Sequence, residues 1–241
     1  MASKDDSIPI EKLGVVNLPQ WEQGWQKAKD AGKDPQFHVK NVHPIFSKHL
    51  EQLTGGRSRL KFLFPLCGKA MDMKWLADQG HTIVGVDGVE DAARQFFQEN
   101  AIQPTVTDVP ALNGKLYQGM EGRVSIYVCD YFNFSSEVKG QFDAIWDRGA
   151  FVAINEVDRE KYVRLMKTLL KPNGRCLMEV YQYEPRLFPG PPHNVPEDEL
   201  KQLLGDYDMA LLDTGDHTER LGKLWNLPWI KTAYFLIKAS N

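Results

Sequence analysis

The sequence predicts an α/β fold built on a mostly parallel sheet. Short apolar runs alternate along the chain with stretches in which apolar residues recur every three or four positions. The runs are typical of buried strands and the recurrences of amphipathic helices, so the alternation indicates βαβ units. The chain has 241 residues, of which 42% are hydrophobic and 25% are charged. These values are those of a globular protein and exclude a disordered chain, a collagen or a coiled coil.

From about residue 42, the first half of the domain contains three helix patterns and two strand patterns. They are a helix through Phe46, His49, Leu50 and Leu53, a strand at 60–64, a helix through Ala70, Met73, Leu76 and Ala77, a strand at 82–87, and a helix through Val89, Ala92, Ala93 and Phe96. Each helix has one apolar face. Thr54-Gly55-Gly56 and Gly80 end the first two helices, because glycine favours the end of a helix.

The second half of the domain begins with a looser segment at residues 101–123, whose prolines and glycines predict a small hairpin or loop. There follow strands at 124–130 and 142–147, a helix through Tyr162, Leu165, Met166 and Leu169, a strand at 175–181, a proline-rich loop at 185–196, a helix through Leu200, Leu203 and Leu204, and strands near 208–213 and at 233–237. Right-handed crossovers place helices on both faces of such a sheet. We therefore expect one domain over residues 41–241.

Residues 1–40 are polar and contain three prolines, yet they also contain Trp21, Trp25 and Phe37. A free tail would not carry two tryptophans, so this segment predicts an arm laid over the domain. Residues 1–7 have no apolar stretch and predict no secretory signal.

Charge, cysteine and histidine content exclude several classes of protein. The net charge of −3 argues against a broad nucleic-acid or anionic-membrane surface. No run approaches the 18 or so apolar residues that a membrane-spanning helix needs. Cys67, Cys129 and Cys176 lie in apolar runs and are expected to be small buried residues of a reducing compartment. The six histidines lack the spacing of metal ligands. We expect a soluble, cytoplasmic protein without a metal.

The ends of the first two predicted strands suggest a nucleoside site, because ligands of parallel sheets bind beyond the carboxyl ends of the strands. The first strand leads into Gly68 and the second ends in Asp87, 19 residues later. A tight turn followed by an acid about 20 residues on is the arrangement that places a ribose between them. A simple helix cap at Asp87 is the alternative.

The number of glycines in this turn discriminates between nucleoside ligands. A dinucleotide needs a G-x-G-x-x-G turn for its pyrophosphate, but only Gly68 is present here. An adenosine ligand without phosphate fits better, and S-adenosylmethionine is the obvious one. The three aromatic residues of the arm agree with this choice, since aromatic faces attract a cation such as a sulfonium. They could equally be a staple that pins the arm to the domain.

Two further strand ends carry polar residues. The predicted strand at 124–130 ends in Asp130 and leads into Tyr131, where a polar group could meet an adenine edge. A strand-end turn is the alternative. Asp147 and Arg148 follow the next strand. Arg148 is permanently charged and could hold the carboxylate of the donor or an anionic acceptor. A surface ion pair is the alternative.

Four motifs together resemble the thiopurine S-methyltransferase family over nearly the whole chain from Trp21. They are Phe64-Pro65-Leu66-Cys67-Gly68-Lys69, Ile145-Trp146-Asp147-Arg148-Gly149-Ala150, Val152-Ala153-Ile154-Asn155 and Pro189-Gly190-Pro191-Pro192. The resemblance implies a Rossmann-like class I methyltransferase with a seven-stranded sheet, which transfers a methyl group from S-adenosylmethionine to a thiol such as a thiopurine. It also implies a role in xenobiotic metabolism. The sequence shows no apolar heptad and no docking strand, so we expect a monomer whose partner is a small-molecule thiol.

The resemblance also assigns site residues. Those implied to bind the donor are Trp21, Trp25, Phe37, Leu66, Gly68, Asp87, Asp130, Tyr131 and Arg148. Those implied to line the acceptor pocket are Phe37, Arg148, Pro191, Pro192 and Arg220. The sequence departs from the family in two places. Asp87 stands where mammalian members carry Glu, and the segment between Trp25 and Phe37 is longer.

Methyl transfer from a sulfonium is an in-line displacement, which depends on alignment of the reacting atoms. Arg148 and Arg220 cannot act as bases, but they could stabilise a thiolate. Asp147 is expected to orient its neighbours or to accept a proton through water, and His217 is an alternative base. Two other functions stay open, a nicotinamide-dependent oxidoreductase and a non-catalytic adenosyl-binding protein.

Overall fold

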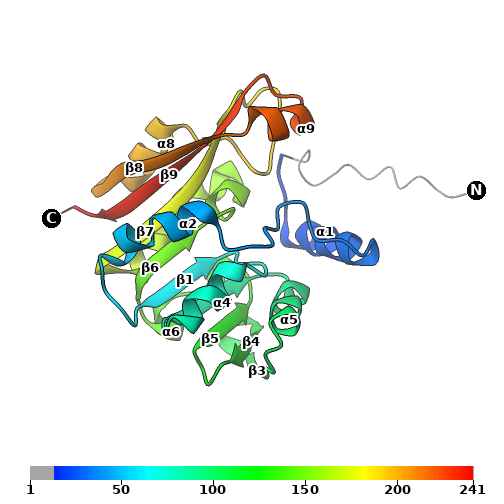
Figure 1. The fold of residues 1–241 in the computed structure, drawn as a ribbon, viewed down its shortest axis with the longest axis vertical. Coiled ribbons are helices and arrows are strands. Elements are labelled where there is room, and N and C mark those ends of the chain that lie inside the picture. Colours follow the sequence, from blue (N-terminus) through cyan, green and yellow to red (C-terminus); the bar gives the residue numbers. More distant parts are fainter. Residues whose placement is uncertain (1–13, 241) are drawn as a thin grey trace, which may run out of the picture.

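A computed structural model describes residues 14–240 and contains one mixed sheet (Figure 1). Its strands are β1 Lys61–Pro65, β2 Thr82–Asp87, β3 Thr105–Val109, β4 Gly114–Gly119, β5 Val124–Val128, β6 Phe142–Asp147, β7 Leu170–Tyr183, β8 Tyr207–Asp216 and β9 Ile230–Ala239. Their order across the sheet is β3-β4-β5-β2-β1-β6-β7-β9-β8. The five strands from β5 to β7 are parallel, and the others pair antiparallel. The predicted α/β class is therefore confirmed.

The sheet within residues 14–240 has nine strands rather than the expected seven. The two additional strands, β3 and β4, form an antiparallel hairpin that pairs with the edge of β5. They lie in the segment 101–123 that predicts a hairpin or loop. β3 is largely exposed, so it lacks the buried apolar run that marks a strand in the sequence.

Helices cover both faces of the sheet, as expected. The helices of residues 14–240 are α1 Leu18–Asp30, α2 Pro44–Lys48, α3 Leu50–Thr54, α4 Met71–Asp78, α5 Glu90–Glu99, α6 Ser136–Lys139, α7 Arg159–Leu169, α8 Glu197–Leu204 and α9 Lys223–Trp225. One core cluster lies between the sheet and helices α7 and α8. A second lies between the opposite face and helices α2 to α5.

Two element boundaries differ from the sequence pattern. The single helix expected through Phe46 and Leu53 is divided into α2 and α3 at His49, whose backbone leaves the helical region at φ −105° and ψ 14°. The His49 Nε2 atom lies 2.9 Å from Asp213 Oδ2 of β8, a distant contact that the local pattern does not contain. Strand β7 also begins earlier than expected, because Leu170 pairs with Phe142 ahead of a bulge.

Helix α1 stands apart from the sheet and lies beside α5 (Figure 1). Asn17 caps its first turn by accepting a hydrogen bond of 3.1 Å from the Gln20 amide, and the Asn17 N–H in turn donates to the Gln20 side-chain oxygen at 2.8 Å. Trp25 is buried against Val89 and Ala92 of the domain. Residues 1–13 of the predicted arm lie outside the described residues.

No helix of residues 14–240 is long and apolar enough to cross a membrane. Over the same range, no three His, Cys, Asp or Glu side chains come together as metal ligands would. The three cysteines are buried and unpaired, which confirms their expected burial. Burial raises the pKa of each of the three thiols, that of Cys129 to about 12, so none of them is a reactive thiolate.

Candidate active site

A cavity of about 440 Å³ lies at the carboxyl ends of β1, β2, β6 and β7, with α1 and residues 36–39 along one side. The strand order reverses direction between β1 and β6, which is where ligands of open parallel sheets bind. The volume falls within the range of roughly 300–1,000 Å³ that small-molecule sites occupy. Of the predicted site residues, those that line it are Trp21, Trp25, Phe37, Leu66, Gly68, Asp87, Arg148, Pro191, Pro192 and Arg220.

The turn after β1 and the acid that ends β2 are directly bonded. Leu66 and Gly68 both have positive φ, 42° and 50°, so the chain bends sharply and presents its amides. The Gly68 N–H donates to Asp87 Oδ2 at 2.7 Å, and the Val89 N–H donates to Oδ1 at 2.8 Å. Burial raises the pKa of Asp87 while these two hydrogen bonds lower it. Each carboxylate oxygen keeps a free lone pair for a further donor.

The aromatic residues of the arm form one cluster over this turn. Phe37 forms T-shaped ring contacts with Trp21 and Trp25, at centroid distances of 5.7 and 5.8 Å. A Cβ atom at Gly68 would lie 3.3 Å from Trp25 Cζ2, so the indole packs directly on the glycine. The carbonyl of Phe37 accepts a hydrogen bond of 2.8 Å from Arg148. Trp21, Trp25 and Phe37 therefore lie at the cavity, as the sequence predicts.

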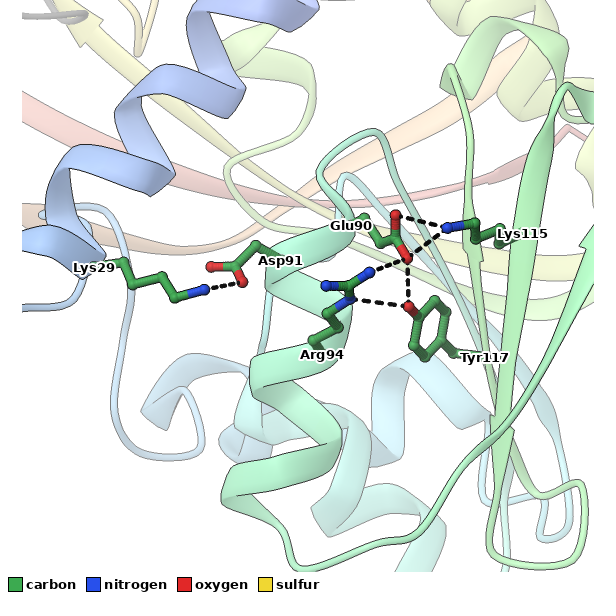
Figure 2. Close-up of polar contacts among 6 residues, drawn as sticks. All are labelled: Lys29, Glu90, Asp91, Arg94, Lys115 and Tyr117. Atoms are coloured by element: carbon green, nitrogen blue, oxygen red, sulfur yellow. Dashed lines mark hydrogen bonds and ion pairs between the residues drawn. The ribbon is translucent and has the colours of Figure 1, made fainter.

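Ion pairs tie the aromatic cluster to the domain. The Lys69 ammonium, almost fully buried, donates to Asp34 Oδ1 and to Glu99 Oε1, each at 2.6 Å. The Lys69 hydrogen bond holds the pKa of Asp34 at about 2. Figure 2 shows a second tie, in which Lys29 of α1 meets Asp91 of α5 at 2.6 Å. Beside it, α5 is bonded to β4 through Glu90, Arg94, Lys115 and Tyr117.

The other end of the cavity carries both charge and apolar surface. Pro191 and Pro192 line it after two cis peptide bonds, and Arg220 approaches from the segment before α9. The Arg148 Nε atom lies 3.5 Å from Glu179 Oε2 of β7. This end can hold an apolar ring that bears an acidic group.

Four predicted residues lie away from the cavity wall. Asp147 is fully buried, and its Oδ2 accepts a hydrogen bond of 2.5 Å from the Tyr162 hydroxyl. Tyr131 is buried against the ring of Tyr162 rather than exposed as a wall. Asp130 accepts from the Phe132 amide at the start of a short 3₁₀ turn. His217 Nε2 lies 3.1 Å from the Thr232 hydroxyl. The position of a residue at a strand end therefore does not show whether its side chain lines the cavity or lies away from it.

The residues of the cavity fit S-adenosylmethionine. Asp87 has free acceptor positions for a ribose, and the single-glycine turn packs against an indole, which leaves no bare helix end for a pyrophosphate. The aromatic cluster suits a sulfonium. Asp87, Leu66, Gly68 and the arm would hold this donor, which supplies a methyl group on a positively charged sulfur.

The fold and this cavity define a class I S-adenosylmethionine-dependent methyltransferase. Solved structures of that class share the fold. A methyltransferase from Anabaena variabilis superposes with a TM-score of 0.64 at 14% identity, covering 98% of this chain and 100% of that one. The 1,6-didemethyltoxoflavin-N1-methyltransferase of Burkholderia thailandensis, bound to S-adenosylhomocysteine, superposes with a TM-score of 0.61 at 17% identity, covering 92% and 87%.

Within that class, the chain belongs to the thiopurine S-methyltransferase (TPMT) family, whose sequence profile matches residues 16–239. A probable thiopurine S-methyltransferase of Danio rerio is 40% identical over 227 residues, which is 92% of this chain and 95% of that protein. The thiopurine S-methyltransferase of Mus musculus is 36% identical over 230 residues, or 95% and 94%. The resemblance stated from the motifs is confirmed.

Among the cavity residues that the sequence did not single out are His43 and Glu179. Glu179 interrupts the apolar run of a central strand, and a lone charge at such a place is a signal that could have been used. His43 lies in the loop before α2 and has no such signal, because only the fold brings it to the end of β7.

Proposed function

We propose that this chain transfers the methyl group of S-adenosylmethionine to the sulfur of aromatic or heterocyclic thiols, thiopurines among them. The observation that carries the proposal is the union of two half-sites in one cavity. One half, at Gly68 and Asp87, has the groups that a nucleoside needs. The other half, at Arg148 and Arg220, has cations beside the apolar surface of two prolines. The relatives named for thiopurine methylation support the same assignment.

The residues proposed for each half follow from their positions. Trp21, Trp25, Leu66, Gly68 and Asp87 bind the donor, and Pro191, Pro192 and Arg220 bind the acceptor; Phe37 and Arg148 serve both. Asp130 remains a prediction for the adenine edge. Asp147 and Tyr131 do not line the cavity and are buried beside Tyr162, so they support the site indirectly. Asp147 also accepts a hydrogen bond of 2.9 Å from the Phe151 amide, so it fixes the loop that carries Arg148.

The chain accelerates the displacement mainly by alignment. S-adenosylmethionine supplies the electrophilic methyl group when bound. The protein must hold the acceptor sulfur in line with it at about 3 Å, which can account for several kcal/mol of the barrier. Arg148 and Arg220 lower the pKa of a bound thiol by charge but take no proton, because guanidinium stays protonated.

The remaining expectations belong to the same proposal. Residues 1–40 form an arm that covers the donor site, and residues 41–241 form the methyltransferase domain. We further propose a cytoplasmic monomer without nucleic-acid or membrane partners. The near-neutral charge balance supports the absence of nucleic-acid and membrane partners. The three unpaired cysteines support a reducing compartment.

Transfer of labelled methyl from S-adenosylmethionine to thiophenol or 6-mercaptopurine tests the proposal. We expect a thioether product, and in Arg220→Ala a raised KM for the thiol. Binding of S-adenosylhomocysteine without transfer to either thiol would instead make the protein a non-catalytic adenosyl-binding protein.

A further inference from the structure

The acceptor end of the cavity contains a buried carboxylate whose role the proposed function leaves unexplained. Glu179 is 2% exposed and lies among apolar neighbours in β7. Its Oε1 atom accepts a hydrogen bond of 2.8 Å from the Tyr234 hydroxyl. Its Oε2 atom is buried and accepts no hydrogen bond from any residue of 14–240, although Arg148 Nε lies 3.5 Å away. A buried charge is costly, so a carboxylate held here against the cavity calls for a function.

His43 is the neighbour of this carboxylate on the cavity wall. Its Nε2 atom lies 3.8 Å from Glu179 Oε1. The other ring nitrogen, Nδ1, is buried and has no hydrogen-bond partner among the described residues, so Nε2 is the atom available to a ligand. The ring is tilted against Trp146 and Tyr234, at centroid distances of 5.6 and 5.8 Å. The His43 amide donates to Asp72 at 2.8 Å, which fixes the backbone.

The surroundings of His43 favour a neutral imidazole at neutral pH. Burial is the largest influence and lowers the pKa of His43 below its ordinary 6.5. The charges that face it act in both directions. Glu179 and Asp72 raise this pKa, whereas Arg148 and His217 lower it. A neutral imidazole can take a proton, and the carboxylate beside it stabilises the imidazolium that results.

The other candidate bases are placed less well. Asp147 is fully buried and already accepts hydrogen bonds from Tyr162 and Phe151. His217 lies beside Thr232, and it is not among the residues of 14–240 that line the cavity. The two arginines cannot accept a proton.

We propose that His43 accepts the proton of the acceptor thiol, with Glu179 as the positioning residue that stabilises its protonated form; this inference rests on the proposed function. As the sulfur–methyl bond forms, the S–H proton passes to Nε2 of His43. The bond between the methyl group and the donor sulfur breaks, and its electron pair stays on that sulfur, which becomes a neutral thioether. The proton leaves to solvent after the products dissociate.

The proposal extends the substrate class. An enzyme that relies on cations alone is restricted to thiols that are acidic enough to ionise beside those cations. With a base beside the acceptor, the cavity also serves thiols that remain protonated near pH 7, for which an ordinary thiol pKa is about 8.5. Alkanethiols and weakly acidic arylthiols therefore belong to its acceptors.

The test compares acceptors of different acidity in three variants, Glu179→Gln, His43→Gln and His217→Gln. Glu179→Gln keeps an oxygen for the Tyr234 hydroxyl but removes the charge. Each variant is assayed with 4-nitrothiophenol, which is ionised at pH 7, and with an uncharged alkanethiol, which is protonated. We expect kcat/KM for the alkanethiol to fall by about 100-fold in the first two variants, as loss of a general base does. The nitrothiophenol value should stay within about threefold.

The pH profile supplies an independent readout. With the alkanethiol, wild-type kcat/KM should level off above the lowered pKa of His43. In His43→Gln it should keep rising up to the pKa of the free thiol, since only the thiolate then reacts. Calorimetric binding of S-adenosylhomocysteine verifies that each variant is folded; if one is not, the other decides.

The outcomes separate the inference from the proposed function. Equal losses for both thiols, or no loss for either, would overturn the role of His43 and leave the methyltransferase intact. An acidity-dependent loss in His217→Gln alone would assign the proton to that residue instead. If wild-type protein methylated neither thiol, the proposed function itself would fail.

Discussion

The amide of Gly68 donates a hydrogen bond of 2.7 Å to the carboxylate of Asp87, nineteen positions further along the chain. This bond links the turn after β1 to the end of β2, so the two walls of the donor half are held by one carboxylate. Asp87 thus shapes the turn and, in our proposal, also contacts the ribose. The shorter Asp side chain is consistent with both tasks, because its other oxygen is already held by the Val89 amide at 2.8 Å.

We predict that Asp87→Asn weakens binding of S-adenosylhomocysteine by about 10- to 100-fold. An amide group presents only one oxygen, so either the Gly68 or the Val89 N–H loses its acceptor. A buried donor without a partner costs about 1–3 kcal/mol, and the ribose contact is lost in addition. Asp87→Ala should weaken donor binding more strongly still. Isothermal titration calorimetry measures the change.

Arg220→Ala is the matched variant at the other end of the cavity. We expect donor affinity within about twofold of wild type and a raised KM for the thiol, because Arg220 lines only the proposed acceptor half. Equal loss of donor affinity in the two variants would contradict the division of the cavity.

The tie between Lys69 and Asp34 predicts an effect on the arm. Asp34 lies three residues before Phe37, and its ion pair with buried Lys69 holds this part of the arm on the domain. In Asp34→Ala, we expect faster dissociation of S-adenosylhomocysteine, by about fivefold to tenfold, the equivalent of roughly 1 kcal/mol. Stopped-flow quenching of tryptophan fluorescence follows the rate.

Lys40→Ala serves as the control for this prediction. Lys40 also pairs with Asp34, at 3.0 Å, but its side chain is 77% exposed, whereas that of Lys69 is 1% exposed. Exposed pairs contribute little, so the dissociation rate should stay near the wild-type value. A similar acceleration in both variants would show that the net charge of the arm matters rather than the buried tie.

A site residue could be predicted from the sequence only where a local pattern marks its position. Gly68 and Asp87 could be placed together because both follow strands, and strand ends of a parallel sheet share one edge. The same reasoning brought Asp147 to that edge but could not tell that its side chain points into the core, toward Tyr162. The contact between His43 and Glu179 joins a loop to a central strand, and no local pattern contains it.

Asp147 predicts a pH dependence of stability. Burial raises the pKa of this carboxyl from 3.8 to about 6. The folded protein therefore binds the proton more tightly than the unfolded chain does, and the stability that this provides is complete below about pH 4 and is lost as the pH rises through about 6. Asp147→Asn mimics the protonated form, with an amide that can donate to Tyr162. Between pH 4.5 and 7.5, wild type should lose about 2 kcal/mol relative to this variant. If the free energies of unfolding of wild type and Asp147→Asn changed in parallel with pH, the assignment of this pH dependence to Asp147 would be contradicted.

The cluster around Glu90 predicts the opposite pH dependence (Figure 2). The Tyr117 hydroxyl donates to Glu90 at 2.5 Å, and hydrogen bonds from Tyr117, Lys115 and Arg94 lower the pKa of Glu90 to about 2. A lowered carboxyl pKa stabilises the fold above the ordinary value of 4.5, and this contribution is lost as the pH falls toward 2.

Glu90→Gln should therefore lower the free energy of unfolding at pH 7 by about 1 kcal/mol, a modest value because the carboxylate is 29% exposed and solvent screens it. At pH 3 the difference from wild type should shrink, since the charge then contributes less. Urea unfolding at the two pH values measures both numbers, and Glu121→Gln on the exposed turn after β4 is the surface control. A deficit that is the same at pH 3 and pH 7 would mean that Glu90 stabilises the attachment of α5 to β4 by packing and not by charge.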